Sequence, residues 1–355
     1  MSQAFRELLK KVGSGTHTSS NLSRAEAAAA LEMMLRQEAT PVQIGAFLIA
    51  HRIKRPTGEE LAGMLDAYDA LGPKVAAIAS TAPVAVFSVP YDGRSRTASI
   101  LPITALILAA AGRPALVHGG DRMATKYGVP LLELWQQLGI DWSALSLEQL
   151  QQTLEQTNLG LLYTSRHFPL SQPLTAARDQ LGKRPPLATL ELFWCPYEGD
   201  AHLCSGYVHP PTEAMMQEAF KLRGQTCYTT IKGLEGSCDL PRDRTAIIGA
   251  YAGRDDLDRL LLNARDWGLS GPEASYISIE TWTTEVQQVL QGQTDSKLYN
   301  AVLWNAGFYL WHLGMAPTLA EGIGQTRALL REGRVAAQLA LLQRHIPQKI
   351  CSSGG

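Results

Sequence analysis

The hydrophobic pattern of the chain changes near residue 81, and this change constrains the fold more than any other feature. After it, β-type runs such as APVAVFSV (82–89) and RPALVHGG (113–120) alternate with helical patterns such as ITALILAAA (103–111) and VPLLELWQQLG (129–139). Strands that alternate with helices form a mostly parallel sheet covered by helices on both faces. The sequence therefore predicts an α/β fold for this part of the chain.

Further elements are expected downstream. The predicted strands are LATLELF (187–193), HLCSGYV (202–208), TCYTTIKG (226–233) and RTAIIGAY (244–251). The predicted helices are 212–223, 295–313 and 318–344.

The residues before the change are helical. Three predicted helices each begin with a hydroxyl residue at the N-cap: Ser23, Thr40 and Thr57. Glu26 and Glu60 follow two of these caps by three residues, which is the spacing of a capping box. With an amphipathic helix at the N-terminus, this pattern predicts a small all-helical domain of about four helices.

The two patterns suggest a domain arrangement. We expect a small helical domain at residues 1–74 and a large α/β domain at 75–168 and 185–355. The segment 169–184 has a helical pattern between β-type regions, and we expect it to cross back to the small domain. Two chain crossings would place a cleft at the domain boundary, where ligand sites are common.

Composition limits the classes of partner. The formal net charge is −1 and the pI is about 6.7, so any basic patch for nucleic acid must be local. The five cysteines include no CxxC pair, which argues against a zinc site or a disulfide framework and favours a reducing cytoplasm. We find no secretory signal and no run long enough to span a membrane.

The segment SVPYDGRSRTASILP (88–102) lies between a predicted strand and a predicted helix, where backbone N–H groups often bind anions. Phosphate loops are normally rich in glycine, but this loop has only Gly93, and Pro90 has no N–H. Arg94 and Arg96 supply guanidinium groups, which bind phosphate in a bidentate manner. Phosphate contact and an ordinary solvent-facing role are equally open for both arginines.

Several blocks of the chain resemble glycosyltransferase family 3, the group of anthranilate phosphoribosyltransferase and the pyrimidine nucleoside phosphorylases. These blocks are LSRAEAAAALEMMLRQEATPVQIGAFLIAHRIKRPTGEELAGMLDAY (22–68), VHGGDRMATKYGVPLLELWQQLGI (117–140), LTAARDQLGKRPP (174–186) and IKGLEGSCDLP (231–241). The resemblance covers nearly the whole chain. It implies a cleft that binds phosphoribosyl pyrophosphate (PRPP) with Mg²⁺, phosphoribosyl transfer to anthranilate in tryptophan biosynthesis, and a homodimer formed through the N-terminal helices.

The resemblance also implies site residues. The family's glycine-rich GTGGDG loop corresponds to residues 88–93, where only the final Asp-Gly pair is kept. The anion-binding residues expected by this resemblance, with the added arginines, are Asp92, Gly93, Arg94, Arg96, His118, Gly119, Arg122, Thr125 and Lys126. Arg178 corresponds to the arginine that binds the carboxylate of anthranilate, a small aromatic acceptor.

The metal motif of the family is altered as well. Glu235 and Asp239 remain at carboxylate positions, but Cys238 replaces an oxygen ligand that a hard cation such as Mg²⁺ requires. We therefore expect weakened or absent metal binding, which leaves transferase activity in question.

The YDGR loop resembles a branch of the family in which some members bind nucleic acid and lack transferase activity. Nucleic-acid binding through a basic interdomain cleft is therefore the alternative to a PRPP-dependent enzyme. The basic residues expected at that cleft are Arg94, Arg96, Arg122, Lys126, Arg178, Lys183, Arg184 and Lys232. Glycosyl transfer from a sugar phosphate other than PRPP is a third hypothesis, for which the sequence offers nothing specific.

Overall fold

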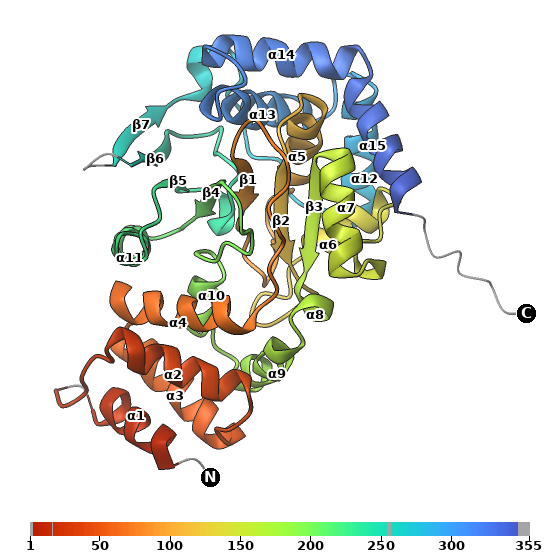
Figure 1. Cartoon of the computed structure of the whole chain (residues 1–355). Coiled ribbons are helices and arrows are strands. Elements are labelled where there is room, and N and C mark those ends of the chain that lie inside the picture. Colours follow the sequence, from red (N-terminus) through yellow and green to blue (C-terminus); the bar gives the residue numbers. More distant parts are fainter. Residues whose placement is uncertain (1–2, 16, 254–256, 347–355) are drawn as a thin grey trace, which may run out of the picture.

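Four helices at the N-terminus form a small helical layer at one end of the molecule (Figure 1). The computed structural model describes residues 3–15, 17–253 and 257–346. The helices of this layer are α1 (Gln3–Gly13), α2 (Arg24–Leu35), α3 (Pro41–Lys54) and α4 (Gly58–Leu71). The prediction of about four helices is confirmed.

The predicted helix starts are also confirmed. The Ser23 side chain accepts a hydrogen bond from the Glu26 N–H, and the Glu26 carboxylate accepts one from the Ser23 N–H. The same reciprocal box joins Thr57 and Glu60 at the start of α4. These bonds satisfy N–H groups that a helix leaves unpaired at its first turn.

In the described part of the chain, one seven-stranded sheet has the order β3-β2-β1-β4-β5-β6-β7 (Figure 1). Its strands are β1 (Val84–Phe87), β2 (Ala115–Gly119), β3 (Leu159–Tyr163), β4 (Ala201–Gly206), β5 (Cys227–Ile231), β6 (Ala246–Ala252) and β7 (Asp258–Leu262). The first five strands in this order are parallel, and β6 and β7 continue it antiparallel. The predicted mostly parallel sheet is confirmed.

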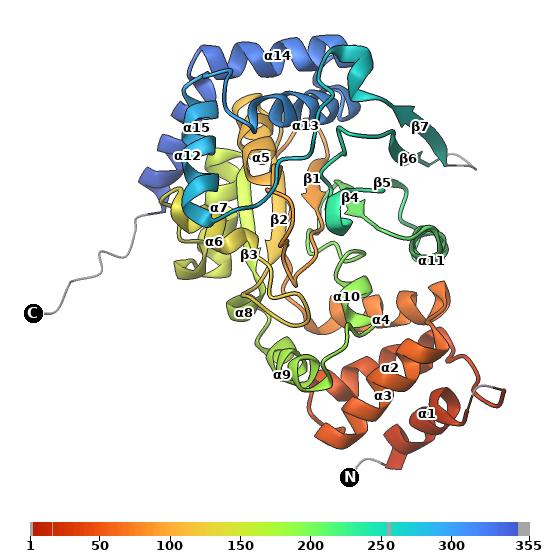
Figure 2. The same cartoon turned by 180° about the vertical axis from the view of Figure 1, so that it is seen from behind.

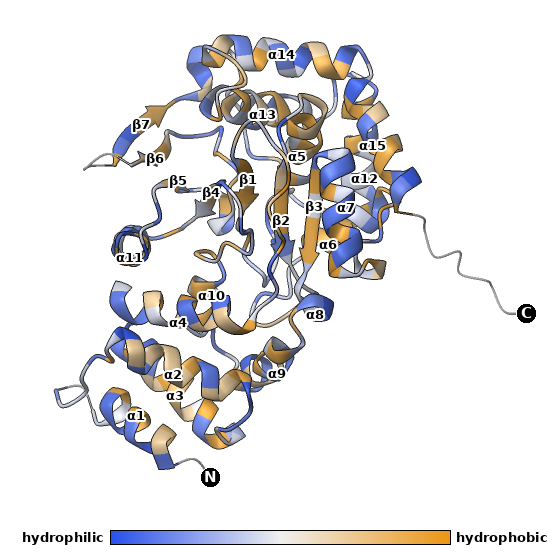
Figure 3. Cartoon of the chain, viewed as in Figure 1, coloured by the Kyte–Doolittle hydropathy of each residue, from blue (hydrophilic) through white to orange (hydrophobic). Residues whose placement is uncertain are grey.

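Helices cover the sheet and bury its centre. The longer ones are α5 (Leu101–Ala110), α7 (Leu147–Thr157), α11 (Pro210–Leu222), α12 (Ile279–Leu290), α13 (Tyr299–His312), α14 (Leu319–Arg331) and α15 (Arg334–His345). The shorter ones are α6 (Leu131–Gln137), α8 (Thr164–His167) and α10 (Leu187–Leu190). Figure 2 shows the same body from behind, and the central strands and α5 are its most apolar parts in Figure 3. Within the described ranges, none of the helices combines the length and the apolar character that a membrane crossing requires.

Two predicted elements are wrong. Residues 187–193 form the short helix α10 and a turn instead of a strand, because Pro185 and Pro186 start a helical turn there. The single helix expected at 318–344 is the pair α14 and α15, which Gly333 separates with a left-handed φ of 70°. The sequence patterns also missed β3 and β7.

The segment 169–184 contains helix α9 (Gln172–Leu181), which packs against α2 and α3 of the helical layer (Figure 1). At its end, the Arg52 Nε of α3 donates a hydrogen bond of 2.8 Å to the backbone oxygen of Arg184. The chain thus leaves the sheet, contacts the helical layer and returns. The domain boundaries at residues 74, 168 and 185 stay predictions.

Glu60 joins several segments of the helical layer. Its buried carboxylate accepts hydrogen bonds from the Leu22 N–H at 2.9 Å, the Thr57 N–H at 2.8 Å and the Lys54 Nζ at 2.8 Å. The His51 Nε2 lies 3.4 Å away. Burial raises the pKa of Glu60, but His51, Lys54 and the Leu22 N–H outweigh it and hold this pKa at about 2.

This lowered pKa predicts an acid-sensitive stability. A carboxyl whose folded pKa is depressed stabilises the fold above its unfolded pKa and loses that contribution as the pH falls toward the folded value. Glu60→Gln should therefore lower the free energy of unfolding by about 3 kcal/mol near neutral pH, and the difference from wild type should shrink between about pH 5 and pH 2. Urea unfolding across this range checks the prediction. Glu32→Gln, at an exposed pair with Arg36, is the matched control; parallel pH profiles for wild type and Glu60→Gln would contradict it.

Candidate functional site

The loop between β1 and α5 folds back on its surroundings through its own N–H groups. The Gly93 N–H donates to the Pro90 oxygen at 3.0 Å, and the Arg94 N–H donates to the Val129 oxygen at 3.3 Å. The Ala98 N–H donates to the Ala274 oxygen at 2.8 Å. These donors are therefore bonded to protein acceptors, whereas a phosphate loop turns such groups toward its ligand.

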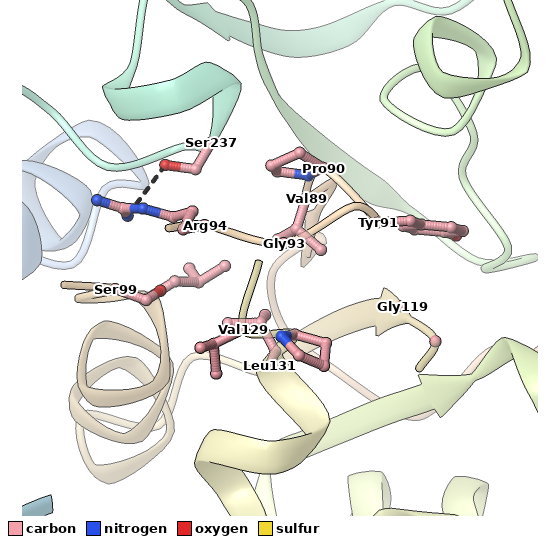
Figure 4. Close-up of a pocket in the computed structure, with 13 residues that line it drawn as sticks. Val89, Pro90, Tyr91, Gly93, Arg94, Ser99, Gly119, Val129, Leu131 and Ser237 are labelled. Carbon is pink, nitrogen blue, oxygen red and sulfur yellow. Dashed lines mark hydrogen bonds between the residues drawn. The ribbon is translucent and has the colours of Figure 1, made fainter. Parts of the chain in front are cut away.

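Gly93 explains how the loop comes so close to its neighbour. It has a φ of 73°, and a Cβ atom there would lie 2.4 Å from the backbone of Gly128. The space beside the loop is lined mainly by apolar side chains, as Val89, Pro90, Val129 and Leu131 show in Figure 4. The glycine serves close backbone packing, and the surface beside it is poorly suited to phosphate.

Glu235 fastens the middle of this loop. Its buried carboxylate accepts hydrogen bonds from the Ser95 N–H at 3.3 Å, the Arg96 N–H at 3.1 Å and the Thr97 N–H at 2.9 Å. The Thr97 hydroxyl adds a fourth bond at 2.9 Å. Burial raises the pKa of Glu235, but these bonds outweigh it and leave the pKa below its ordinary value, so the carboxylate stays ionised.

Asp239 fastens the end of the loop. Its buried Oδ2 accepts a hydrogen bond from the Ile100 N–H at 2.8 Å and pairs with the Arg94 guanidinium. Arg94 also donates to the Ser237 hydroxyl at 3.3 Å, drawn as a dashed line in Figure 4, and its Nε lies 3.9 Å from a Glu235 oxygen. Arg94 is therefore buried between two carboxylates and is not a solvent-facing loop residue.

These contacts leave the predicted metal ligands, Glu235 and Asp239, poorly suited to bind Mg²⁺. A divalent cation needs several free oxygen ligands, whereas Glu235 and Asp239 face backbone donors and the Arg94 guanidinium. Within residues 3–15, 17–253 and 257–346, no group of three or more acidic, histidine or cysteine side chains is arranged to hold a metal. The residues present do not fit Mg²⁺.

Other predicted anion-binding residues also have protein partners. Arg122 makes two hydrogen bonds of 2.6 Å to the carboxylate of Glu133. His118 is fully buried, and the Tyr91 hydroxyl lies 2.6 Å from its Nδ1. Burial lowers the pKa of His118 to about 3, so the ring is neutral near neutral pH. Gly119 ends β2 and lines the apolar pocket of Figure 4.

Asp92, Lys126 and Arg184 form a second arrangement, which we call the Asp92 cluster. Lys126 Nζ and Arg184 Nη2 each lie 3.8 Å from Asp92 Oδ1, and both cations are partly exposed. Asp92 is fully buried, and neither of its carboxylate oxygens has a hydrogen-bond partner among the described residues. Thr125 precedes Lys126 and is half-buried. The cluster joins the loop after β1, the loop after β2 and the segment after α9.

Arg178 of α9 lies in a pocket between the helical layer and the sheet body. Its guanidinium pairs with the buried carboxylate of Glu191 at 2.5 Å. Burial alone lowers the pKa of Arg178, but the attraction of Glu191 outweighs it, so the guanidinium stays charged. Aromatic side chains form much of the pocket wall: Tyr68, Tyr91, Phe168 and Trp194. Two nitrogens of Arg178 and one oxygen of Glu191 lack hydrogen-bond partners in the described structure.

Glu191 and Tyr91 are site residues that were not predicted from the sequence. Glu191 is the only charged residue in the run PPLATLELFW, and a lone carboxylate in an apolar stretch signals a buried partner. That signal was available, although it does not identify Arg178 as the partner. Tyr91 carries no comparable signal.

Comparisons with known sequences place the chain among glycosyl transferases. The anthranilate phosphoribosyltransferase of Methylobacterium radiotolerans is 28% identical over 350 residues, which cover 96% of each chain. That of Paracidovorax citrulli is 25% identical over 315 residues, covering 88% of this chain and 89% of the relative.

Solved structures share the fold. Anthranilate phosphoribosyltransferase from Thermus thermophilus superposes with a TM-score of 0.79 at 20% identity and covers 98% of this chain and 100% of its own. The enzyme from Saccharomyces cerevisiae in complex with PRPP and Mg has a TM-score of 0.81 at 16% identity, with 96% and 97% covered. The helical bundle domain of the glycosyl transferase family matches residues 6–72 and its a/b domain matches residues 93–336, so the chain belongs to this glycosyl transferase family.

Proposed function

We propose that the chain binds a phosphoribosyl compound at the Asp92 cluster and uses it as a glycosyl donor, with a phosphate or pyrophosphate on the anomeric carbon as the leaving group. The relatives named above are phosphoribosyltransferases, which supports a phosphoribosyl ligand. The observation that carries the proposal is the buried Asp92 carboxylate, which has no hydrogen-bond donor in the described structure and two cations beside it.

The chemistry of the cluster suggests both parts of such a ligand. A buried carboxylate without hydrogen bonds is costly, and the hydroxyl groups of a sugar would supply the missing donors. Lys126 and Arg184 would bind the phosphate, since both are partly exposed and Arg184 Nε has no partner in the described structure. A sugar phosphate presents donors and a dianion on one small molecule.

The same contacts argue against the family's usual donor geometry. In the loop after β1, the N–H groups of Ser88 and of residues 93–98 are bonded to protein, Pro90 has no N–H, and the neighbouring pocket is apolar. We therefore propose that pyrophosphate is not wrapped by residues 88–93, and that phosphate recognition has moved to Lys126 and Arg184.

The alternative of nucleic-acid binding has less support. Of the basic residues expected at the cleft, Arg94 and Arg178 are buried in pairs with carboxylates, and both hydrogen bonds from Arg122 to Glu133 are 2.6 Å. Phosphate-backbone binding needs unpaired cations on one surface. The comparisons reported above name phosphoribosyltransferases and no nucleic-acid-binding protein.

The predicted homodimer has one supporting feature. Helix α3 carries Val42, Ala46, Ile49 and Ile53 at helical spacing, and Val42 and Ile53 are 82% and 74% exposed. An exposed apolar stripe of this kind favours a subunit contact. We propose that the N-terminal helices associate there, in a cytoplasmic protein.

Removing one cation tests the donor site. Lys126→Ala and Arg184→Ala should each weaken binding of ribose 5-phosphate by about 10- to 100-fold, because each removes a charge-assisted contact to phosphate. Titration calorimetry with ribose 5-phosphate and with PRPP measures the effect. Arg122→Ala is the matched control, since Glu133 already holds this guanidinium and binding should stay near the wild-type level. Absence of binding to the wild-type protein, or equal loss in the control, would contradict the proposal.

The Arg178–Glu191 pair predicts that the aromatic pocket binds an aromatic carboxylate only weakly. Glu191 neutralises Arg178, so an aromatic carboxylate such as anthranilate finds little net attraction there. Glu191→Gln removes this neutralising charge and should tighten binding of anthranilate about tenfold, or by ~1.4 kcal/mol.

Fluorescence titration with anthranilate checks this prediction, and Glu133→Gln serves as a surface control. Equal affinity in wild type and Glu191→Gln would show that Glu191 does not set the charge preference of the pocket.

A further inference from the structure

The position of Arg94 suggests a role beyond the proposed ligand. This side chain is 6% exposed although it comes from a loop. It pairs with Asp239, donates to the hydroxyls of Ser237 and Thr97, and lies 3.9 Å from Glu235. A guanidinium with this many partners is fixed in position and is not free to bind a ligand.

The charges around Arg94 balance. Glu235 and Asp239 bring two negative charges into a buried region, where unpaired charges are strongly unfavourable. Arg94 supplies one positive charge between them. Arg96 approaches Glu235 at 3.7 Å from the solvent side and supplies the second. The protein thus neutralises both carboxylates with its own side chains.

We infer that Arg94 is a built-in cation that occupies the place of a divalent metal between Asp239 and Glu235. The two buried carboxylates are therefore held without a metal ion. A guanidinium stays protonated at every physiological pH and cannot be removed by a chelator. It also donates N–H groups, whereas a metal accepts lone pairs, and so it keeps the two carboxylates from coordinating an ion. The inference concerns the chain without any ligand and does not depend on the proposed sugar phosphate.

One atom allows a sharp test. Asp239 Oδ1 is buried and lacks a hydrogen-bond partner among the described residues. The other carboxylate oxygens of Asp239 and Glu235 accept hydrogen bonds, so this oxygen is the one open to a divalent ion at this site. Asp239→Asn therefore separates a metal at this place from ions bound elsewhere on the surface.

Two measurements on the full chain test the inference. The first is Mn²⁺ binding, read from the electron paramagnetic resonance signal of the free ion. The second is thermal unfolding with and without millimolar Mn²⁺ or Mg²⁺. We expect the wild-type protein to show the same Mn²⁺ binding as Asp239→Asn, and a melting temperature that neither ion changes. In Arg94→Ala the carboxylates lose their cation, and Mn²⁺ should then raise the melting temperature by about 2–4 °C.

Two variants serve as controls. Arg94→Lys keeps the charge and should respond to Mn²⁺ much less than Arg94→Ala. Arg122→Ala removes a cation that pairs with Glu133 outside this site and should behave like wild type.

Two results would overturn the inference. The first is Mn²⁺ binding to the wild-type protein that Asp239→Asn abolishes, and the second is an Arg94→Ala protein that Mn²⁺ does not stabilise. If Arg94→Ala does not fold, the comparison of wild type with Asp239→Asn decides alone.

Discussion

The hydrogen bonds that attach the loop after β1 to Glu235 and Asp239 determine which backbone groups of the site are free to bind a ligand. Three consecutive N–H groups bond to Glu235, and the N–H of Ile100 bonds to Asp239, just before α5 begins. Hydrogen bonds from backbone donors to buried carboxylates are among the stronger ones in proteins, and breaking one leaves a buried charge unsatisfied. Residues 93–98 and Ile100 are therefore closed on their own protein, and their N–H groups are not free to bind a phosphate.

In the proposed function, ligand recognition lies at the boundary with the helical layer. There, Lys126 and Arg184 each lie 3.8 Å from Asp92, and Arg178 pairs with Glu191 in a pocket lined partly by aromatic side chains. The crossover helix α9 is essential to this arrangement, because it positions Arg178 within the helix and Arg184 just after it. A chain that kept the family fold could thus change its ligand by altering a few side chains at the boundary.

Local features of the fold could be predicted from the sequence, whereas the pairing of charges could not. Capping at Ser23 and Thr57 depends on residues three positions apart, so sequence spacing determines it. The prediction of a strand at 187–193 is wrong because the apolar residues of this segment suit a buried helical turn as well as a strand. The two prolines before the segment favour the helical turn. Arg94 and Asp239 are 145 positions apart. The resemblance placed Asp239 at the site, but nothing local showed that Arg94 would turn inward to meet it.

Hydrogen exchange of the amides at residues 93–98 and 100, measured in the free protein and with PRPP and Mg²⁺, tests most directly whether the loop is closed. We predict slow exchange in the free protein, because these N–H groups are already bonded to Glu235, Asp239 and backbone oxygens. We also predict no further slowing when PRPP and Mg²⁺ are added. Fast exchange in the free protein that becomes protected with PRPP and Mg²⁺ would show that the loop is an open phosphate site, and would contradict a loop closed on its own protein.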